Sequence, residues 1–361
     1  MPAPPDWTFF RSALLDWYDP ARRPMPWKAV GDPYRVWLSE IILQQTRVAQ
    51  GLPYYERFLA AYPTVNDLAD ADDDAVMKLW EGLGYYSRAR NLLRAARHVR
   101  DAHDGRFPDT YDGLRELPGV GPYTAAAIAS FAFGRPVAVL DGNVYRVLAR
   151  YAADATPTDG GRGRRHFQYA VDTALGDAPA AIFNQAIMDF GALVCTPRNP
   201  ACSACPLSAR CAALASGTTA AFPVKKPAAA RRTRYFHYLD VTDAAGQRYL
   251  AQRSGNDIWQ DLYEFPLLET ETEGHTLTEL RSSAQWPEWL PATFEEDGRG
   301  GPYRQQLSHQ NIIAVFYRLR VAAALTPPPG IIRVTDEALA SYAFPRVLNR
   351  YLDDRTLQLP F

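Results

Sequence analysis

The chain has 361 residues, which is too long for one ordinary hydrophobic core and predicts about two domains. Its net charge of −1 gives no bulk attraction to a polyanion, so any nucleic-acid site would have to rest on local patches and backbone amides. The sequence does not open like a signal peptide, and no run approaches the roughly 18 uncharged residues of a membrane span. We therefore expect a cytoplasmic protein with no membrane partner.

The first part of the sequence, residues 1–217, has the pattern of helices with short breaks. Apolar residues recur at three- and four-residue spacing, and prolines stand where helices are expected to start or stop. The predicted helical runs are 33–49, 53–61, 74–80, 87–103, 122–133, 143–153, 164–175 and 179–194. Residues 218–234 are rich in proline, alanine and basic residues and have no periodicity, which predicts an interdomain linker.

The sequence pattern changes after this linker. Residues 235–241 and 248–251 have the pattern of strands around a turn, and 311–324 is an apolar run rich in β-branched and aromatic residues. Residues 336–353 have the pattern of a helix. The fold class predicted is therefore an all-helical domain followed by a small α+β domain at 235–361.

Glu40 is the first candidate for acid–base chemistry. Its neighbours three and four residues away on the predicted helix are Val36, Trp37, Leu43 and Gln44. Removal from water on this mostly apolar face would raise the pKa of the carboxyl, which suits a general acid. The alternative is an ordinary glutamate on an exposed helix face.

Leu117-Pro-Gly-Val-Gly121 stands between two helical stretches, so residues 114–131 are predicted to form a helix-hairpin-helix. Gly119 and Gly121 permit a tight turn and the close approach of another chain. The amides of this turn, including that of Val120, would hold a DNA phosphate together with the positive end of the following helix. The alternative is a simple glycine-containing corner between helices.

Asp141 is a second candidate carboxylate. It opens the sequence Asp-Gly-Asn-Val after the apolar run 137–140 and precedes a predicted helix. Acid–base chemistry with two carboxylates requires one to be protonated and the other ionised, in environments that differ. The alternative for Asp141 is a helix N-cap, a position that aspartate favours.

The four cysteines lie within seventeen residues, and the rest of the chain contains none. Thiols so concentrated indicate one metal centre, because sets of four cysteines bind zinc or an iron–sulfur cluster. Structural zinc usually takes two C-x2–4-C pairs, whereas this segment, 195–211, has one C-x2-C flanked by gaps of six and five residues. Disulfides would cross-link only this short loop. The candidate ligands are Cys195, Cys202, Cys205 and Cys211.

These motifs resemble those of the endonuclease III superfamily of helix-hairpin-helix DNA glycosylases, and in particular its MutY adenine glycosylase family. The cysteine spacing resembles the family's [4Fe–4S] loop, and Leu-Pro-Gly-Val-Gly resembles its hairpin. Residues 37–46, WLSEIILQQT, are similar to the segment that carries the family's catalytic glutamate. Further similar segments, which extend the resemblance over the first domain, are 15–18, 26–27, 82–86, 89–91, 141–144, 184–185 and 191–195.

The resemblance implies how a glycosidic bond would be broken. Glu40 would protonate the extruded adenine, and Asp141 would stay ionised and face the sugar. Asn143 matches a family residue that helps to hold the water or the sugar. Bifunctional relatives carry a lysine two residues after the last hairpin glycine, where this chain has Tyr123, which implies a monofunctional glycosylase.

Four further positions are implied to contact the duplex or the adenine. Gln44 and Tyr85 match residues that wedge into the duplex beside the extruded base. Asp189 aligns with an acidic position that contacts adenine, and Trp27 is a candidate for the pocket wall. The alternatives are a helix-surface glutamine, a core tyrosine and a core tryptophan.

The second domain resembles the family's MutT-like (Nudix-fold) domain, which checks for 8-oxoguanine on the opposite strand. It contains no Nudix signature of clustered glutamates, so we expect recognition without pyrophosphate hydrolysis. The family's Phe-Ser-His loop corresponds to Leu307-Ser308-His309. Ser308 and His309 can hydrogen-bond to the modified base or its phosphate, and Leu307 departs from the aromatic residue.

The implied partner is double-stranded DNA containing adenine opposite 8-oxoguanine or guanine, bound by a monomer that associates with the nucleoid through DNA. The implied cofactor is a [4Fe–4S] cluster. An endonuclease III-like glycosylase and lyase is one alternative function, which Tyr123 and the second domain oppose. A non-catalytic iron–sulfur DNA sensor is another, which the presence of both Glu40 and Asp141 opposes.

Overall fold

A computed structural model describes residues 4–28, 31–226 and 230–357 of the chain. The chain divides into two compact units: unit 1 is Met1–Asp70 with Asn91–Pro227, and unit 2 is Ala71–Arg90 with Ala228–Phe361. Among the described residues, none of the helices combines the length and the apolar character needed to cross a bilayer.

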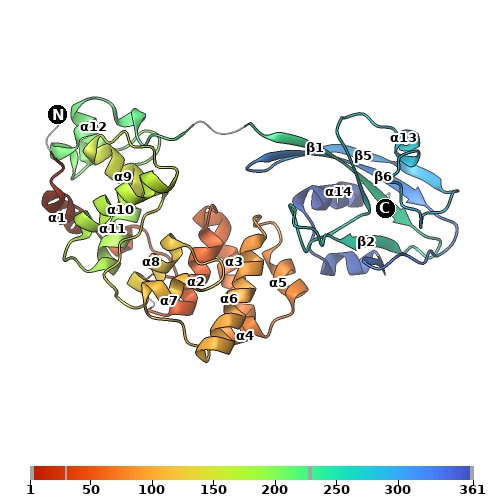
Figure 1. Cartoon of the computed structure of the whole chain (residues 1–361), viewed down its shortest axis with the longest axis horizontal. Helices are drawn as coiled ribbons and strands as arrows, with labels where there is room; N and C mark the ends of the chain where they lie inside the picture. Colours follow the sequence, from red (N-terminus) through yellow and green to blue (C-terminus); the bar gives the residue numbers. More distant parts are fainter. Residues whose placement is uncertain (1–3, 29–30, 227–229, 358–361) are drawn as a thin grey trace. The chain divides into compact units, whose positions relative to one another are not determined.

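Unit 1 is helical (Figure 1). Its α-helices are α1 Trp7–Trp17, α2 Pro33–Leu43, α3 Val48–Ala61, α4 Val65–Ala69, most of α6 Ser87–His103, α7 Tyr111–Arg115, α8 Pro122–Phe131, α9 Gly142–Ala152, α10 Gly161–Leu175, α11 Ala180–Leu193 and α12 Ala212–Ala215. Short 3-10 turns lie at η1 Pro20–Arg22, η2 Cys202–Ala204, η3 Ser208–Arg210 and η4 Thr219–Ala221.

The helices of unit 1 form two packed groups. In one group, α1 from the start of the chain lies against α10 and α11 (Figure 1), and its buried side chains Phe10 and Leu14 join the core of α9, α10 and α11. In the other group, α2 packs against α3 and α8. Because α8 also contacts α11, the two groups meet along α8 and α11, and this junction places the candidate site described below.

The predicted single helix over 33–49 is wrong. α2 ends at Leu43 and α3 begins at Val48, because Gln45 takes a positive φ of 57° that ends a right-handed helix. Apolar residues keep helical spacing on both sides of the break, so their periodicity does not reveal it. The break places Gln44 and Thr46 on the wall of the cavity described below.

Unit 2 contains α5 Asp73–Trp80, the first turn of α6 and a seven-stranded sheet. Five strands follow the order β3-β2-β1-β6-β5, while β4 pairs with β1 and β7 with β2; β1 and β6 run parallel, and the other pairs are antiparallel. The strands are β1 Arg232–Thr242, β2 Arg248–Gln252, β3 Tyr263–Glu264, β4 Leu267–Thr270, β5 Glu295–Gln306, β6 Gln310–Arg320 and β7 Ile331–Val334. Its remaining helices are α13 Leu277–Arg281, η5 Glu337–Ser341 and α14 Arg346–Leu357.

One face of this sheet is covered by α14. Tyr351 of α14 stacks on Phe316 of β6 with ring centroids 4.0 Å apart and the ring planes nearly parallel. The opposite face buries a separate apolar cluster that includes Leu239, Leu268 and Leu319. Apolar side chains on both faces explain why β1 and β6 have nearly continuous apolar sequences.

The sequence predicted β1, β2 and β6 but not β5. The sequence of β5, EEDGRGGPYRQQ, has no apolar alternation, and its pairing with β6 contains two register shifts. The predicted helix 336–353 is also interrupted, because α14 begins only after Pro345, which cannot continue a helix from the preceding η5. The predicted order, a helical part followed by an α+β part, is confirmed.

Candidate active site

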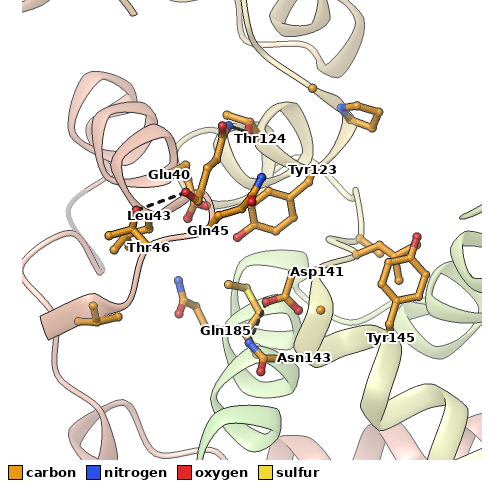
Figure 2. A pocket seen from close by; sticks show the side chains of 18 of the residues that line it. Glu40, Leu43, Gln45, Thr46, Tyr123, Thr124, Asp141, Asn143, Tyr145 and Gln185 are labelled. Atoms are coloured by element: carbon orange, nitrogen blue, oxygen red, sulfur yellow. Dashed lines mark hydrogen bonds between the residues drawn. The ribbon is translucent and has the colours of Figure 1, made fainter. Parts of the chain in front are cut away.

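A cavity of about 680 Å3 lies within unit 1 (Figure 2). Its wall is formed by α2, α8, the start of α9, α10, α11 and the segment before α2. Seven residues predicted from the sequence line it: Trp27, Glu40, Gln44, Gly121, Tyr123, Asp141 and Asn143.

Glu40 reaches the cavity from α2, a helix with a well-defined start. Asp32 caps it by accepting hydrogen bonds from the amides of the first turn, and Pro33 takes its first position. The side chain of Glu40 is only 7% exposed and bonds to Tyr123. Burial raises the pKa of Glu40 to about 7, and the nearby charge of Asp141 adds to the rise.

Asp141 lies in a more polar setting than Glu40. It is the N-cap of α9, where Oδ1 accepts from the amide of Val144 at 2.7 Å and Oδ2 accepts from Nδ2 of Asn143 at 2.8 Å. Burial raises the pKa of Asp141, while these hydrogen bonds and the charge of Arg146 oppose the rise. Asp141 is therefore both the predicted N-cap and a cavity carboxylate, with more groups that favour its ionised form than Glu40 has.

Tyr123 follows Pro122 at the start of α8 and places its phenol against Glu40. Burial, followed by the charges of Glu40 and Asp141, raises the pKa of Tyr123 well above its ordinary value. The phenol therefore stays neutral and donates a hydrogen bond to the Glu40 carboxylate. No amine stands at this position.

The raised pKa of Glu40 predicts how the stability of the folded protein depends on pH. The folded protein holds this proton more tightly than the unfolded chain, whose glutamate has a pKa near 4.5. Stability is therefore lost as the pH rises from about 4.5 through 7, in total by about 3 kcal/mol. Glu40→Gln should be about 3 kcal/mol more stable than wild type at pH 8 and equal to it at pH 4. Denaturant unfolding at both pH values tests this, with the exposed Glu56→Gln as the control.

The hairpin between α7 and α8 is built as the sequence predicts. Gly119 has φ of 74°, and a Cβ on it would lie 2.5 Å from Cβ of Asn91, so only glycine fits. Val120 is buried, and its amide donates to the carbonyl of Leu117 at 3.0 Å, so it closes the turn. Gly121 is the N-cap of α8 without a side-chain cap, and it lines the cavity. The unpaired amides at this helix start are suited to an anion.

The two hairpin glycines should respond differently to the same substitution. Gly119→Ala combines a positive φ with a steric clash and should destabilise the protein by about 2 kcal/mol. Gly121→Ala adds a methyl group that meets no atom within 4 Å, so stability should change by less than about 0.5 kcal/mol. That methyl group should nevertheless weaken DNA binding, because Gly121 lines the cavity at the helix start where the phosphate would lie. Thermal unfolding and duplex binding of both variants test this, and unchanged binding by Gly121→Ala would contradict the phosphate role.

The four cysteines line one small space, which Arg150 adjoins. All four thiols are free, which is against the disulfide alternative. Burial and neighbouring thiols raise the pKa of Cys205 to about 11, and burial also raises the pKa of Cys211, so bound cations would be needed to hold these two as thiolates. Within the described residues no three potential ligands are placed to hold one metal ion. Thiols that surround a space suit a multi-iron cluster, which when bound would cross-link the loop.

Arg146 connects this cysteine loop to Asp141, and the sequence did not single it out. Its guanidinium donates to the carbonyl of Cys195 at 2.7 Å, to that of Gly191 at 2.7 Å and to Oδ1 of Asn143 at 2.8 Å. Asn143 in turn donates to Asp141. The only local signal was an arginine within the apolar face of α9.

Asp189 differs in placement from the other predicted residues. It is 2% exposed, accepts from Arg23 at 2.9 Å and Lys28 at 2.5 Å, and is not among the residues of the cavity wall. Lys28 and Gln185 do line the cavity, although the sequence analysis gave neither a role. In the sequence, only their positions relative to predicted site residues could have indicated a role for them: Lys28 follows Trp27, and Gln185 lies one helical turn before Asp189.

Of the remaining predicted residues, Gln44 and Trp27 line the cavity of unit 1, whereas Tyr85 lies in unit 2. Nε2 of Gln44 donates to Oγ1 of Thr124 at 3.2 Å. Trp27 is buried, packs edge-to-face on Tyr55 and also lines the cavity, so it is a core residue that is placed on the cavity wall. Tyr85 belongs to unit 2, where it is 46% exposed with φ of 48°, which excludes a core role.

A second cavity, of about 580 Å3, lies within unit 2. Tyr85 and the loop of Leu307, Ser308 and His309 line it. Ser308 and His309 are exposed and hydrogen-bond to each other at 3.0 Å. Tyr85, which is predicted to wedge into the duplex, therefore shares one cavity of this unit with Ser308 and His309, which are predicted to contact the opposite strand.

Comparison with known proteins first defines a class. Residues 38–164 match the HhH-GPD superfamily of base excision DNA repair proteins, residues 195–211 match the iron-sulfur binding domain of endonuclease III, and residues 237–354 match the NUDIX domain. A thermostable thymine-DNA glycosylase has a similar structure, with a TM-score of 0.54 and 30% identity over 58% of this chain and 97% of that one. An endonuclease III trapped on DNA shares the fold, with a TM-score of 0.51 and 22% identity over 59% of this chain and 98% of that one. These matches define a helix-hairpin-helix DNA repair protein and support the predicted [4Fe–4S] cofactor.

The curated relatives narrow this class. The chain is 34% identical to the adenine DNA glycosylase of Homo sapiens over 95% of this chain and 74% of that protein. It is also 34% identical to the enzyme of Buchnera aphidicola subsp. Baizongia pistaciae over 71% of this chain and 73% of that protein. The Mus musculus enzyme is 44% identical over 58% of this chain, an alignment that spans only 42% of the mouse protein. The chain belongs to the adenine DNA glycosylase family.

Proposed function

We propose that the protein is a monofunctional DNA glycosylase that hydrolyses the N-glycosidic bond of adenine mispaired with 8-oxoguanine or guanine, in base excision repair. One observation carries the proposal: a single cavity is lined by a buried glutamate with a pKa of about 7 and by a hydrogen-bonded aspartate. Cleavage of a C–N glycosidic bond needs a proton donor and an anionic group at one site. Membership of the adenine DNA glycosylase family identifies adenine as the nucleobase that is removed.

In this proposal Glu40 donates its proton to N7 of the extruded adenine. The C1′–N9 bond then breaks, and its electron pair leaves with adenine, which departs as a neutral base. The positive charge on the sugar is stabilised by the Asp141 carboxylate, which Asn143 holds in place. Water adds to C1′ and releases a proton, which leaves an abasic site in an intact backbone. Tyr123 has no amine that could form a Schiff base and cleave the strand.

Other residues would hold the duplex open and read it. Gln44 and Tyr85 would fill the gap beside the extruded base, and the hairpin amides at Gly119 and Gly121 would hold a phosphate. Trp27 would form the adenine wall, and Asp189 would act on the pocket through Arg23 and Lys28. Ser308 and His309 would contact the base opposite adenine. The protein would act as a monomer in the cytoplasm, on the DNA of the nucleoid.

Single-turnover cleavage tests the function directly. A duplex with adenine opposite 8-oxoguanine is incubated with excess protein and then treated with alkali, beside a sample without alkali. Strand breaks that appear only after alkali are expected. Breaks without alkali would indicate a lyase, and no breaks from protein with an intact iron–sulfur absorption spectrum would indicate a non-catalytic DNA sensor.

A further inference from the structure

Three cationic residues line the catalytic cavity, and their surroundings differ. Arg23 and Lys28 share the buried carboxylate of Asp189, which neutralises part of their charge. Arg164 of α10 is exposed at the cavity wall, and its hydrogen bond is to the neutral phenol of Tyr145. Within the described part of the chain, Arg164 has no carboxylate partner. It is therefore a cation that an incoming anion can use without breaking an ion pair.

The position of Arg164 follows from two adjacent helices. Tyr145 lies one turn after Asp141 on α9, so both residues face the same cavity. The ring of Tyr145 packs edge-to-face on Phe167 of α10 at 5.4 Å, which fixes the phenol that accepts from Arg164. In Figure 2, Asp141 lies between Glu40 on one side and Tyr145 on the other. The Arg164 and Tyr145 end of the cavity is thus on the far side of Asp141 from the general acid.

This geometry has a consequence for a bound DNA strand. If the base lies toward Glu40 and the sugar lies at Asp141, the strand leaves the sugar in two directions, each through a phosphate. The amides at Gly121 line one part of the same cavity and suit one phosphate. Arg164 lies in another part of the cavity. Without this arginine, the negative charge of Asp141 would repel the phosphates of the strand there.

We propose that Arg164, held by Tyr145, binds a backbone phosphate of the adenine-bearing strand beside the extruded nucleotide. This inference rests on the proposed function, because that function places the strand in the cavity. Arginine is suited to the task, since its planar guanidinium offers two parallel donors to phosphate oxygens while a third can bond to the phenol. Arg164 would position the strand, and Asp141 would act on the sugar.

The test measures binding, not catalysis. The probe is a duplex in which the target nucleotide is a tetrahydrofuran abasic analogue opposite 8-oxoguanine, so that there is no base to remove. Arg164→Gln should bind about 3- to 10-fold more weakly near 0.1 M salt, and the slope of log affinity against log salt should fall by about one. Arg164→Lys should restore most of the slope. Arg165→Gln is the matched control, because it makes the same charge change on the same helix outside the cavity wall.

Neutral linkages identify the phosphate. A methylphosphonate is placed in turn at the linkage on the 5′ side of the analogue and at the linkage on its 3′ side. At one of these linkages Arg164→Gln should lose its penalty, whereas Arg165→Gln should keep whatever penalty it has. An unchanged affinity and slope for Arg164→Gln, or a penalty that persists at every linkage, would overturn the proposal. Thermal unfolding confirms that the variants are folded, and adenine release by wild type is scored separately because it reports on the proposed function alone.

Discussion

Glu40→Gln is expected to lower the single-turnover rate of adenine release by about 10^3-fold while leaving duplex affinity within about threefold of wild type. The amide keeps the shape of the carboxyl and its contact with Tyr123 but has no acidic proton to donate. Wild type should lose rate as the pH rises through about 7, by about tenfold for each further unit, because the protonated form of Glu40 is the active one. The residual rate of Glu40→Gln should not show this decline.

The control for this prediction is Glu56→Gln, an exposed glutamate on α3, which should retain the wild-type rate and pH profile. Quenched reactions between pH 5.5 and 9 with a duplex containing adenine opposite 8-oxoguanine give the rates. If Glu40→Gln keeps the alkaline decline of wild type, another group is the acid. A rate loss accompanied by an equal loss of duplex affinity would instead indicate a binding role.

The sequence was most informative where a local motif determines both the backbone and the chemistry. The hairpin is one case, because the positive φ of Gly119 and its closeness to Asn91 require glycine at a fixed place in the motif. Asp141 is another, since the same carboxylate caps α9 and lines the cavity. In both cases a short segment contains the whole structural reason.

The contacts that tune the carboxylates could not be predicted from local patterns. Tyr123 and Glu40 are on different helices, and only tertiary packing brings the phenol to the carboxylate. Arg146 likewise reaches the carbonyl of Cys195, which is 49 residues away. The Arg164 and Tyr145 pair depends on the packing of α10 against α9, although each helix was predicted separately.

Strand β5 shows the same limit in unit 2. Most of its side chains are exposed, so its sequence has no apolar alternation, and its existence depends on pairing with β6. The break at Gln45 is the opposite case, because the apolar spacing continues across a change of backbone direction. Periodicity records which residues are buried, and it does not record how the chain connects them.

Asp141→Asn is the second substitution expected to have a large effect, with about a 10^3-fold loss in adenine release. Asparagine caps a helix about as well as aspartate, so α9 should stay folded and stability should change by less than about 1 kcal/mol. The variant removes the negative charge that faces the sugar. Because burial raises the pKa of Asp141, wild type should also lose rate at acidic pH as this carboxylate is protonated, and the variant should lack that acidic decline.

A binding comparison separates charge stabilisation from positioning. Wild type should bind a duplex with a cationic pyrrolidine in place of the target sugar more tightly than one with neutral tetrahydrofuran, because only the former pairs with the Asp141 carboxylate. Asp141→Asn should lose most of this preference and retain its affinity for tetrahydrofuran. Asp32→Asn, the same change at the N-cap of α2, should leave both affinities and the rate unchanged. If Asp141→Asn weakens both analogues equally, Asp141 acts by holding the strand and not by stabilising the charge on the sugar.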